Sequence, residues 1–102
     1  MKCKAYHIFF QNLANPLKTK IVEKLKEKPM SVSELMKEIN VEQSKLSHAL
    51  MNLRKCHIVD SKQVGKQRIY SLNKKTIVPI LKILDKHRAN FCPGCNLKWK
   101  YI

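Results

Sequence analysis

The sequence predicts a mainly α-helical domain with one small β-hairpin, an α+β fold in a single domain of 102 residues. Three observations carry this prediction. Apolar residues recur at helical spacing up to residue 55, the period changes to alternation over residues 58–72, and helical spacing returns from residue 76. A chain of about 100 residues closes around one hydrophobic core. We therefore expect five helices, with the hairpin between the fourth and the fifth.

Two helices are expected before Pro29. Residues 3–13 carry aromatic and aliphatic side chains at helical spacing, and Asn15-Pro16 separates this segment from the next one. Asn caps helix starts and Pro suits the first helical turn, so the second helix is expected over residues 16–28.

A helix, a tight turn and another helix come next. Ser31, with Glu34 three residues later, has the form of a capping box that begins a short helix ending at Ile39. Residues 40–43 interrupt the apolar pattern, which then resumes through Leu53. These segments predict a helix-turn-helix over residues 31–55.

A hairpin and a final helix complete the pattern. Alternating residues 58–63 and 67–72 flank Gly65, which predicts a hairpin within residues 56–72. Residues 76–91 return to helical spacing, and residues 92–102 form a cysteine-containing tail without a regular pattern.

The charge of the chain indicates a polyanionic partner. Lys and Arg number 21 against 7 Asp and Glu, giving a formal net charge of +14. After Glu42 there are thirteen basic residues and only two acidic ones, Asp60 and Asp85. Lys-rich surfaces also serve solubility alone, so the charge specifies nucleic acid only together with a suitable fold.

The order of elements supplies that fold. A helix-turn-helix followed by a basic hairpin is a winged helix-turn-helix, which binds double-stranded DNA by placing its second motif helix in the major groove. Helical spacing turns the apolar residues of that helix inward and its hydrogen-bonding residues outward. Gln43 is expected to contact a base, whereas Ser44, Ser47 and His48 can contact a base or a phosphate. The expected contacts to phosphate are Lys45, Arg54 and Lys55. The expected wing contacts are Lys62, Lys66, Gln67 and Arg68, on phosphate or in the minor groove.

The same residues resemble the ArsR/SmtB family of arsenical- and metal-responsive repressors over roughly residues 9–72. The resemblance lies in Asn12-Leu13-Ala14-Asn15-Pro16-Leu17, Ser31-Val32-Ser33-Glu34-Leu35, Gln43-Ser44-Lys45-Leu46-Ser47-His48-Ala49-Leu50, Leu53-Arg54 and Tyr70-Ser71-Leu72. It implies a homodimer, joined through residues 1–14 and 74–91, that represses a promoter until an inducer alters the dimer. The apolar faces of these two segments agree with such an interface, which we assign to Tyr6, Phe9, Phe10, Leu13, Ile77, Ile80, Leu81 and Leu84.

The sensing sites of the family are missing here. Thiol-sensing members carry cysteines in the first motif helix, where this chain has none over residues 34–39. Zinc-sensing members place Asp and His pairs at both ends of the last helix, whereas this chain has only Asp85 and His87 near one end. Glu42 also replaces the usual Ser-like cap of the recognition helix.

The cysteines suggest a separate site. Cys92 and Cys95 have C-x-x-C spacing, which suits one tetrahedral zinc or other thiophilic ion, a redox disulfide, or an inert turn. A metal would need further ligands from Cys3, His87 or a second subunit. No cofactor is certain. Cys56 is expected to pack against the hairpin as a small apolar side chain.

Several function classes remain in view. The leading one is a sequence-specific, dimeric repressor. We expect it in the cytoplasm, because no apolar run approaches the ~20 residues of a membrane span and no signal-peptide cleavage site follows residue 10. The alternatives are a non-regulatory architectural or nucleic-acid coat protein with the same fold, and a cysteine-based metal or redox protein. No catalytic triad, carboxylate pair or phosphate loop is present, so an enzyme is not expected.

Overall fold

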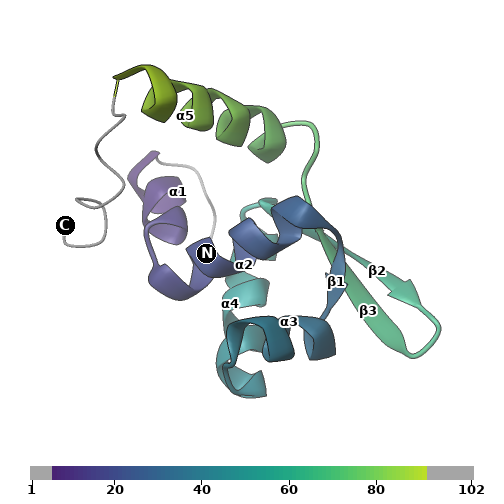
Figure 1. Ribbon diagram of the computed structural model, residues 1–102. Helices are drawn as coiled ribbons and strands as arrows, with labels where there is room; N and C mark the ends of the chain where they lie inside the picture. Colours follow the sequence, from purple (N-terminus) through teal and green to yellow (C-terminus); the bar gives the residue numbers. More distant parts are fainter. Residues whose placement is uncertain (1–5, 92–102) are drawn as a thin grey trace.

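The computed structural model describes residues 6–91 and contains the expected five helices and hairpin, together with one short additional strand (Figure 1). The helices are α1 (Tyr6–Leu13), α2 (Pro16–Glu27), α3 (Val32–Ile39), α4 (Gln43–Lys55) and α5 (Ile77–Phe91), and the strands are β1 (Met30–Ser31), β2 (Val59–Val64) and β3 (Gln67–Leu72). The order of these elements confirms the winged helix-turn-helix prediction.

Side-chain caps start two of the helices as the sequence predicted. The Asn15 side chain accepts hydrogen bonds from the Leu17 and Lys18 amides, at 2.9 and 3.1 Å, and begins α2. The capping box of α3 is complete: the Glu34 amide donates to Ser31 Oγ at 3.2 Å, and the Ser31 amide donates to Glu34 Oε1 at 3.0 Å. The hydrogen bond from the Ser31 backbone lowers the pKa of Glu34, because it stabilises the ionised carboxylate.

The turn between α3 and α4 depends on Asn40. Its φ of 58° lies in the left-handed region, which Asn tolerates better than most residues, and its amide donates to Met36 O at 2.8 Å. The chain then re-enters a helix at Gln43, where Glu42 occupies the cap position without a side-chain hydrogen bond.

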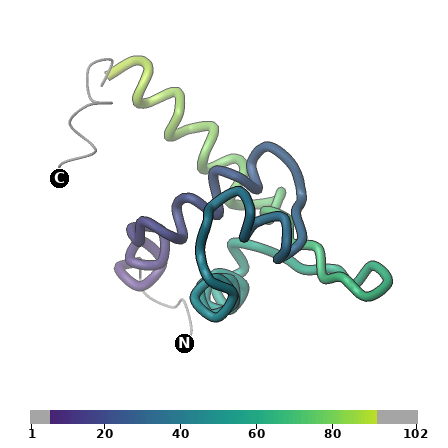
Figure 2. The backbone as a smooth tube through the Cα atoms, turned by 60° about the horizontal axis from the view of Figure 1, so that its bottom comes forward, coloured from purple at the N-terminus to yellow at the C-terminus, as the bar shows by residue number. Residues whose placement is uncertain are grey.

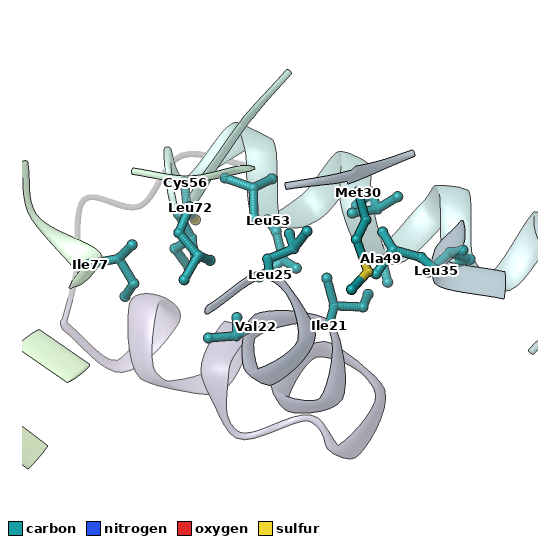
Figure 3. Packing of buried hydrophobic residues seen from close by; sticks show 14 residues of the cluster. Ile21, Val22, Leu25, Met30, Leu35, Ala49, Leu53, Cys56, Leu72 and Ile77 are labelled. Atoms are coloured by element: carbon teal, nitrogen blue, oxygen red, sulfur yellow. The ribbon is translucent and has the colours of Figure 1, made fainter. Parts of the chain in front are cut away.

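The core lies between α2, α3, α4 and the sheet. Figure 3 shows Ile21, Val22 and Leu25 pointing from α2 toward the side chains of α4 and the sheet, including Leu53 and Leu72. All five are at most about 5% exposed. The apolar stripes predicted for α2 and α4 are therefore the faces that pack together, which leaves the opposite face of α4 in solvent.

Strand β1 was not predicted. It has two residues and exists only through its pairing with β3, where Met30 lies opposite Tyr70 and Ser31 opposite Ile69. The sheet is antiparallel, in the order β1-β3-β2. Two residues are too few to display an alternating pattern, so nothing local in the sequence marks this strand.

The hairpin and the helices at the chain ends extend in opposite directions. In both views, the β2–β3 tip projects away from α1 and from the far end of α5 (Figures 1 and 2). Only Ile77 is fully buried within α5, so this helix is anchored mainly at its first turn. None of the helices in the described part of the chain is long and apolar enough to cross a membrane.

Candidate nucleic-acid interface

One face of α4 is exposed and mostly polar. Leu46, Ala49, Leu50 and Leu53 are buried in the core. The predicted Gln43, Ser44, Lys45, Ser47 and His48 are all exposed on the outward face, where the apolar side chain of Met51, which was not predicted, is also exposed. Their amide, hydroxyl, imidazole and ammonium groups can donate to base edges or to phosphate, so the structure supports the predicted division of this helix into two faces.

A hollow beside this face adds a cation that the sequence analysis missed. Its volume is about 520 Å³, and it lies between the start of α2 and the outward side of α4. Lys18 of α2 lines it together with Ser44, Lys45 and His48. Lys18 and Lys45 thus line the same hollow as Ser44 and His48, and two cations beside two hydrogen-bonding side chains suit a phosphate backbone. No sequence pattern marks Lys18, because its role depends on how α2 packs against α4.

The wing carries its cations on two faces. Its turn is Gly65-Lys66, and Gly65 has a φ of +62° that residues with a side chain rarely adopt. Opposed residues share a face, so Arg68, opposite Gln63, lies on one side of the hairpin. Lys62, opposite Ile69, lies on the other side.

The predicted wing residues therefore do not form one surface. Lys66 occupies the tip, and Gln67 shares the face of Lys62. Arg68 donates to Ser61 Oγ at 3.0 Å, which holds its guanidinium along the strand. Arg54 and Lys55 are exposed at the far end of α4, apart from the hollow.

A partly buried hydrogen bond links α1 to the recognition helix. Asn12 is 2% exposed, and its Nδ2 donates to the backbone oxygen of Asn52 at 3.1 Å. Its Oδ1 is also buried and has no hydrogen-bond partner among the described residues. Because Asn52 lies on α4 beside the hollow, α1 and the candidate DNA-reading helix are held together by a polar contact.

The predicted dimer residues fall into two groups. Ile77 is buried in the core of the protomer, and Phe9, Leu13 and Leu81 pack against that core. The large apolar side chains that remain exposed on the terminal helices are Tyr6 at 87%, Phe10 at 61%, Ile83 at 68%, Leu84 at 48% and Phe91 at 74%, while Ile80 is half-buried.

The predicted dimer surface therefore lacks Ile83 and Phe91, which are exposed apolar residues. It includes Ile77, which is buried in the protomer. The apolar stripe predicted for α5 includes Ile77, whose side chain faces the core of the protomer. The i, i+4, i+8 spacing of Ile83, His87 and Phe91 was a signal for a second face of α5.

The predicted metal site is mostly outside the described residues. Cys3, Cys92 and Cys95 lie there, and only His87 is described, with its ring centroid 5.0 Å from that of Phe91. Within residues 6–91, no group of three or more His, Cys, Asp or Glu side chains is arranged to hold a metal ion. Cys56 is buried as expected, but its sulfur belongs to a disulfide and is not a free thiol.

Comparison with known proteins agrees with this geometry. The family model described as "Bacterial regulatory protein, arsR family" matches residues 15–61. The uncharacterized HTH-type transcriptional regulator Rv0081 of Mycobacterium tuberculosis is 35% identical over 79 residues, or 76% of this chain and 69% of that protein. The crystal structure of Rv0081 superposes on this chain with a TM-score of 0.73. The superposition covers 79% of this chain and 82% of the Rv0081 chain.

Two further structures share the fold. The transcriptional repressor BigR from Xylella fastidiosa is 28% identical with a TM-score of 0.69, covering 84% of this chain and 85% of that one. The homodimeric winged helix-turn-helix DNA-binding domain of Mb0332 from Mycobacterium bovis has a TM-score of 0.75 at 14% identity, covering 84% and 80%, and this likeness concerns the fold alone. The chain belongs to the ArsR family of bacterial regulatory proteins, and it is a winged helix-turn-helix DNA-binding transcriptional regulator rather than an enzyme.

Proposed function

We propose that this chain is a cytoplasmic, homodimeric repressor that recognises a specific operator in double-stranded DNA. One observation carries the proposal: the exposed face of α4 presents Gln43, Ser44, Ser47 and His48, while its opposite face is fixed in the core. A helix held in this way can present its side chains to base edges in a defined register. Repression is supported by the 28% identity to BigR, which is a transcriptional repressor.

The proposed contacts to DNA are of two kinds, those that read bases and those that position the protein on the phosphate backbone. Gln43 suits the paired donor and acceptor of adenine, and Ser47 and His48 suit base edges near the start of the helix. Lys18 and Lys45 neutralise phosphates beside the hollow, and Lys66 reaches the backbone or the minor groove from the wing tip. The positioning cations give affinity, whereas the polar face of α4 gives sequence preference.

Dimerisation is supported by the apolar surface at the end of the molecule away from the wing. Tyr6, Phe10, Ile83, Leu84 and Phe91 stay exposed in the protomer, which is costly for apolar side chains of this size. A two-fold dimer that buries them would place two α4 helices in successive major grooves, about 34 Å apart on a palindromic operator.

The reading role is tested by the double substitution of Ser47→Ala and His48→Ala. Both side chains are exposed, so folding should be retained. We expect the specificity ratio, which is roughly 10³ or more for a regulator, to fall toward one while weak non-specific binding remains. Operator and random duplexes compared by fluorescence anisotropy measure this ratio, with Ser33→Ala as a control for an exposed serine outside α4. If the preference survives in the double variant, the proposed reading face is wrong; if the unsubstituted protein shows no preference, an architectural role replaces the repressor.

The dimer surface is tested by Ile83→Lys combined with Phe91→Lys. We expect a monomer in sedimentation equilibrium and a large loss of operator affinity, because the two substitutions would bury four unpaired cations at the interface of a two-fold dimer. The control is Asn90→Lys, which adds one positive charge at an exposed polar position of the same helix. A double variant that remains dimeric would place the interface elsewhere.

A further inference from the structure

A second hollow lies where α5 leaves the domain. Its volume is about 620 Å³, within the range of small-molecule sites, and it lies between the last turn of α2, the end of β3 and the first turns of α5. Its apolar part comes from Leu25 and Leu72, which are buried, and from Val78 and Leu81, which are half-buried. We call it the α2–α5 cleft.

Lysines from separate elements surround this apolar floor. Lys28 follows α2, Lys74 precedes α5 and Lys82 lies on α5, and all three are exposed at the cleft. A single lysine that covers apolar surface with its stem is ordinary. Here Lys28 meets Lys74 and Lys82, which come from a distant part of the sequence, at the same apolar surface, and this indicates an anion as the complementary partner.

The charge balance at the rim favours the same partner. Lys26 is paired with Asp85 of α5, and the carboxylate of Glu27 is 4.0 Å from the ammonium of Lys24. Within residues 6–91, no carboxylate forms an ion pair with Lys28, Lys74 or Lys82. The acidic groups at the cleft therefore have partners. Lys28 also acts on the carboxylate of Glu34, whereas Lys74 and Lys82 have no ion pair among the described residues.

We propose that the α2–α5 cleft binds a small organic anion with an apolar body and one carboxylate, of the kind represented by a medium-chain fatty acid. A neutral apolar molecule would contact the apolar residues of the cleft and leave the lysines without a partner. An inorganic anion would contact the lysines and leave the apolar residues uncovered. The DNA-facing hollow lies at the other end of α2, a helix of 12 residues that is about 18 Å long. The anion and DNA therefore occupy different sites.

The position of the cleft gives the anion a route to regulation, and this part of the inference rests on the proposed function. Beyond Ile77, the side chains of α5 are half-buried or exposed, and its ion pair from Asp85 to Lys26 crosses from α5 to α2 at the cleft. A carboxylate among the lysines competes electrostatically with Asp85, and an apolar body between α2 and α5 changes how α5 is seated. Because α5 carries the proposed dimer surface, the ligand would shift the arrangement of the two recognition helices.

The site is tested by calorimetric titration with decanoate, with decanol and inorganic phosphate as comparators for its two halves. We expect saturable binding of decanoate, at least about tenfold tighter than that of either comparator. Substitution of Lys74→Glu with Lys82→Glu should weaken decanoate binding about tenfold or more. The matched control is Lys20→Glu with Lys86→Glu, which changes the net charge equally at exposed positions of α2 and α5 outside the cleft.

Several results would overturn the site. Equal binding of decanol and decanoate would remove the role of the lysines, and equal losses in both double variants would reduce the effect to net charge. Amide chemical-shift changes in NMR spectra should centre on Leu72 and Val78. Changes centred on Ile83 and Phe91 would instead place decanoate on the exposed face of α5.

The regulatory step has its own readout. Decanoate should weaken operator binding by the unsubstituted protein and leave the affinity of the Lys74→Glu and Lys82→Glu variant unchanged. If decanoate binds in the cleft and DNA affinity does not change, the regulatory step is wrong while the site stands. If the protein shows no operator preference at all, the proposed function fails, and the calorimetric result for the cleft is unaffected.

Discussion

The hydrogen bond between Asn12 and Asn52 offers a direct test of how α1 positions the recognition helix. Asn12 is almost completely buried, and its Nδ2 donates to the Asn52 carbonyl of α4 at 3.1 Å. Substitution of Asn12→Ala removes this donor and leaves a small void. A typical hydrogen bond within a protein contributes about 1 kcal/mol net, and the lost packing adds up to a similar amount, so the free energy of unfolding should fall by about 1–2 kcal/mol.

Substitution of Asn12→Asp removes the hydrogen-bond donor of the side chain while keeping its size and shape. The carboxylate keeps the volume of the amide but presents only acceptors to the Asn52 carbonyl, and the other oxygen of this side chain has no hydrogen-bond partner among the described residues. We expect a loss of about 3 kcal/mol at neutral pH, because a buried charge is left unpaired. Burial raises the pKa of this carboxyl in the folded state, so the folded protein binds the proton more tightly than the unfolded chain does. The deficit relative to the unsubstituted protein should therefore shrink as the pH falls through that raised pKa.

Urea unfolding followed by circular dichroism measures both effects, and operator affinity is measured where every variant is folded. The control is Gln11→Ala, the exposed neighbour of Asn12 on the same helix. We expect both Asn12 variants to bind the operator more weakly than the control does, because α4 loses its hydrogen bond to α1. If Asn12→Ala matches Gln11→Ala in stability and in DNA affinity, the bond does not position α4 and the reasoning is refuted.

Two further predictions concern charge. Lys18→Ala and Lys66→Ala should each reduce the slope of log affinity against log salt concentration by about 0.9, if each lysine neutralises one phosphate; an unchanged slope in filter-binding or anisotropy titrations would remove that residue from the interface. Because the pKa of Glu34 is lowered by the Ser31 backbone, its ionised carboxylate stabilises the fold above the ordinary glutamate pKa, and this contribution is lost as the pH falls through the lowered value. Glu34→Gln should therefore show a weaker fall in stability on the acid side than the unsubstituted protein, and identical acid unfolding profiles for the two would contradict this.

Much of the fold could be predicted because its signals are local. Asn15 and the pair of Ser31 and Glu34 satisfy backbone groups within three residues, so the starts of α2 and α3 are recorded in adjacent sequence. The periodicity of Leu46 and Leu50 likewise identifies the buried face of α4 and, by subtraction, its polar face. Such features need no knowledge of distant residues.

The sequence by itself determined the order of elements, the inward and outward sides of α4 and the excess of positive charge. The tertiary structure alone decided which elements meet: β1 forms because β3 is beside it, and Lys18 joins the DNA-facing hollow because α2 packs on α4. It also assigned Ile77 to the core and left Ile83 exposed. The physical reason is that periodicity reports which side of an element is apolar, whereas burial depends on what lies against that side.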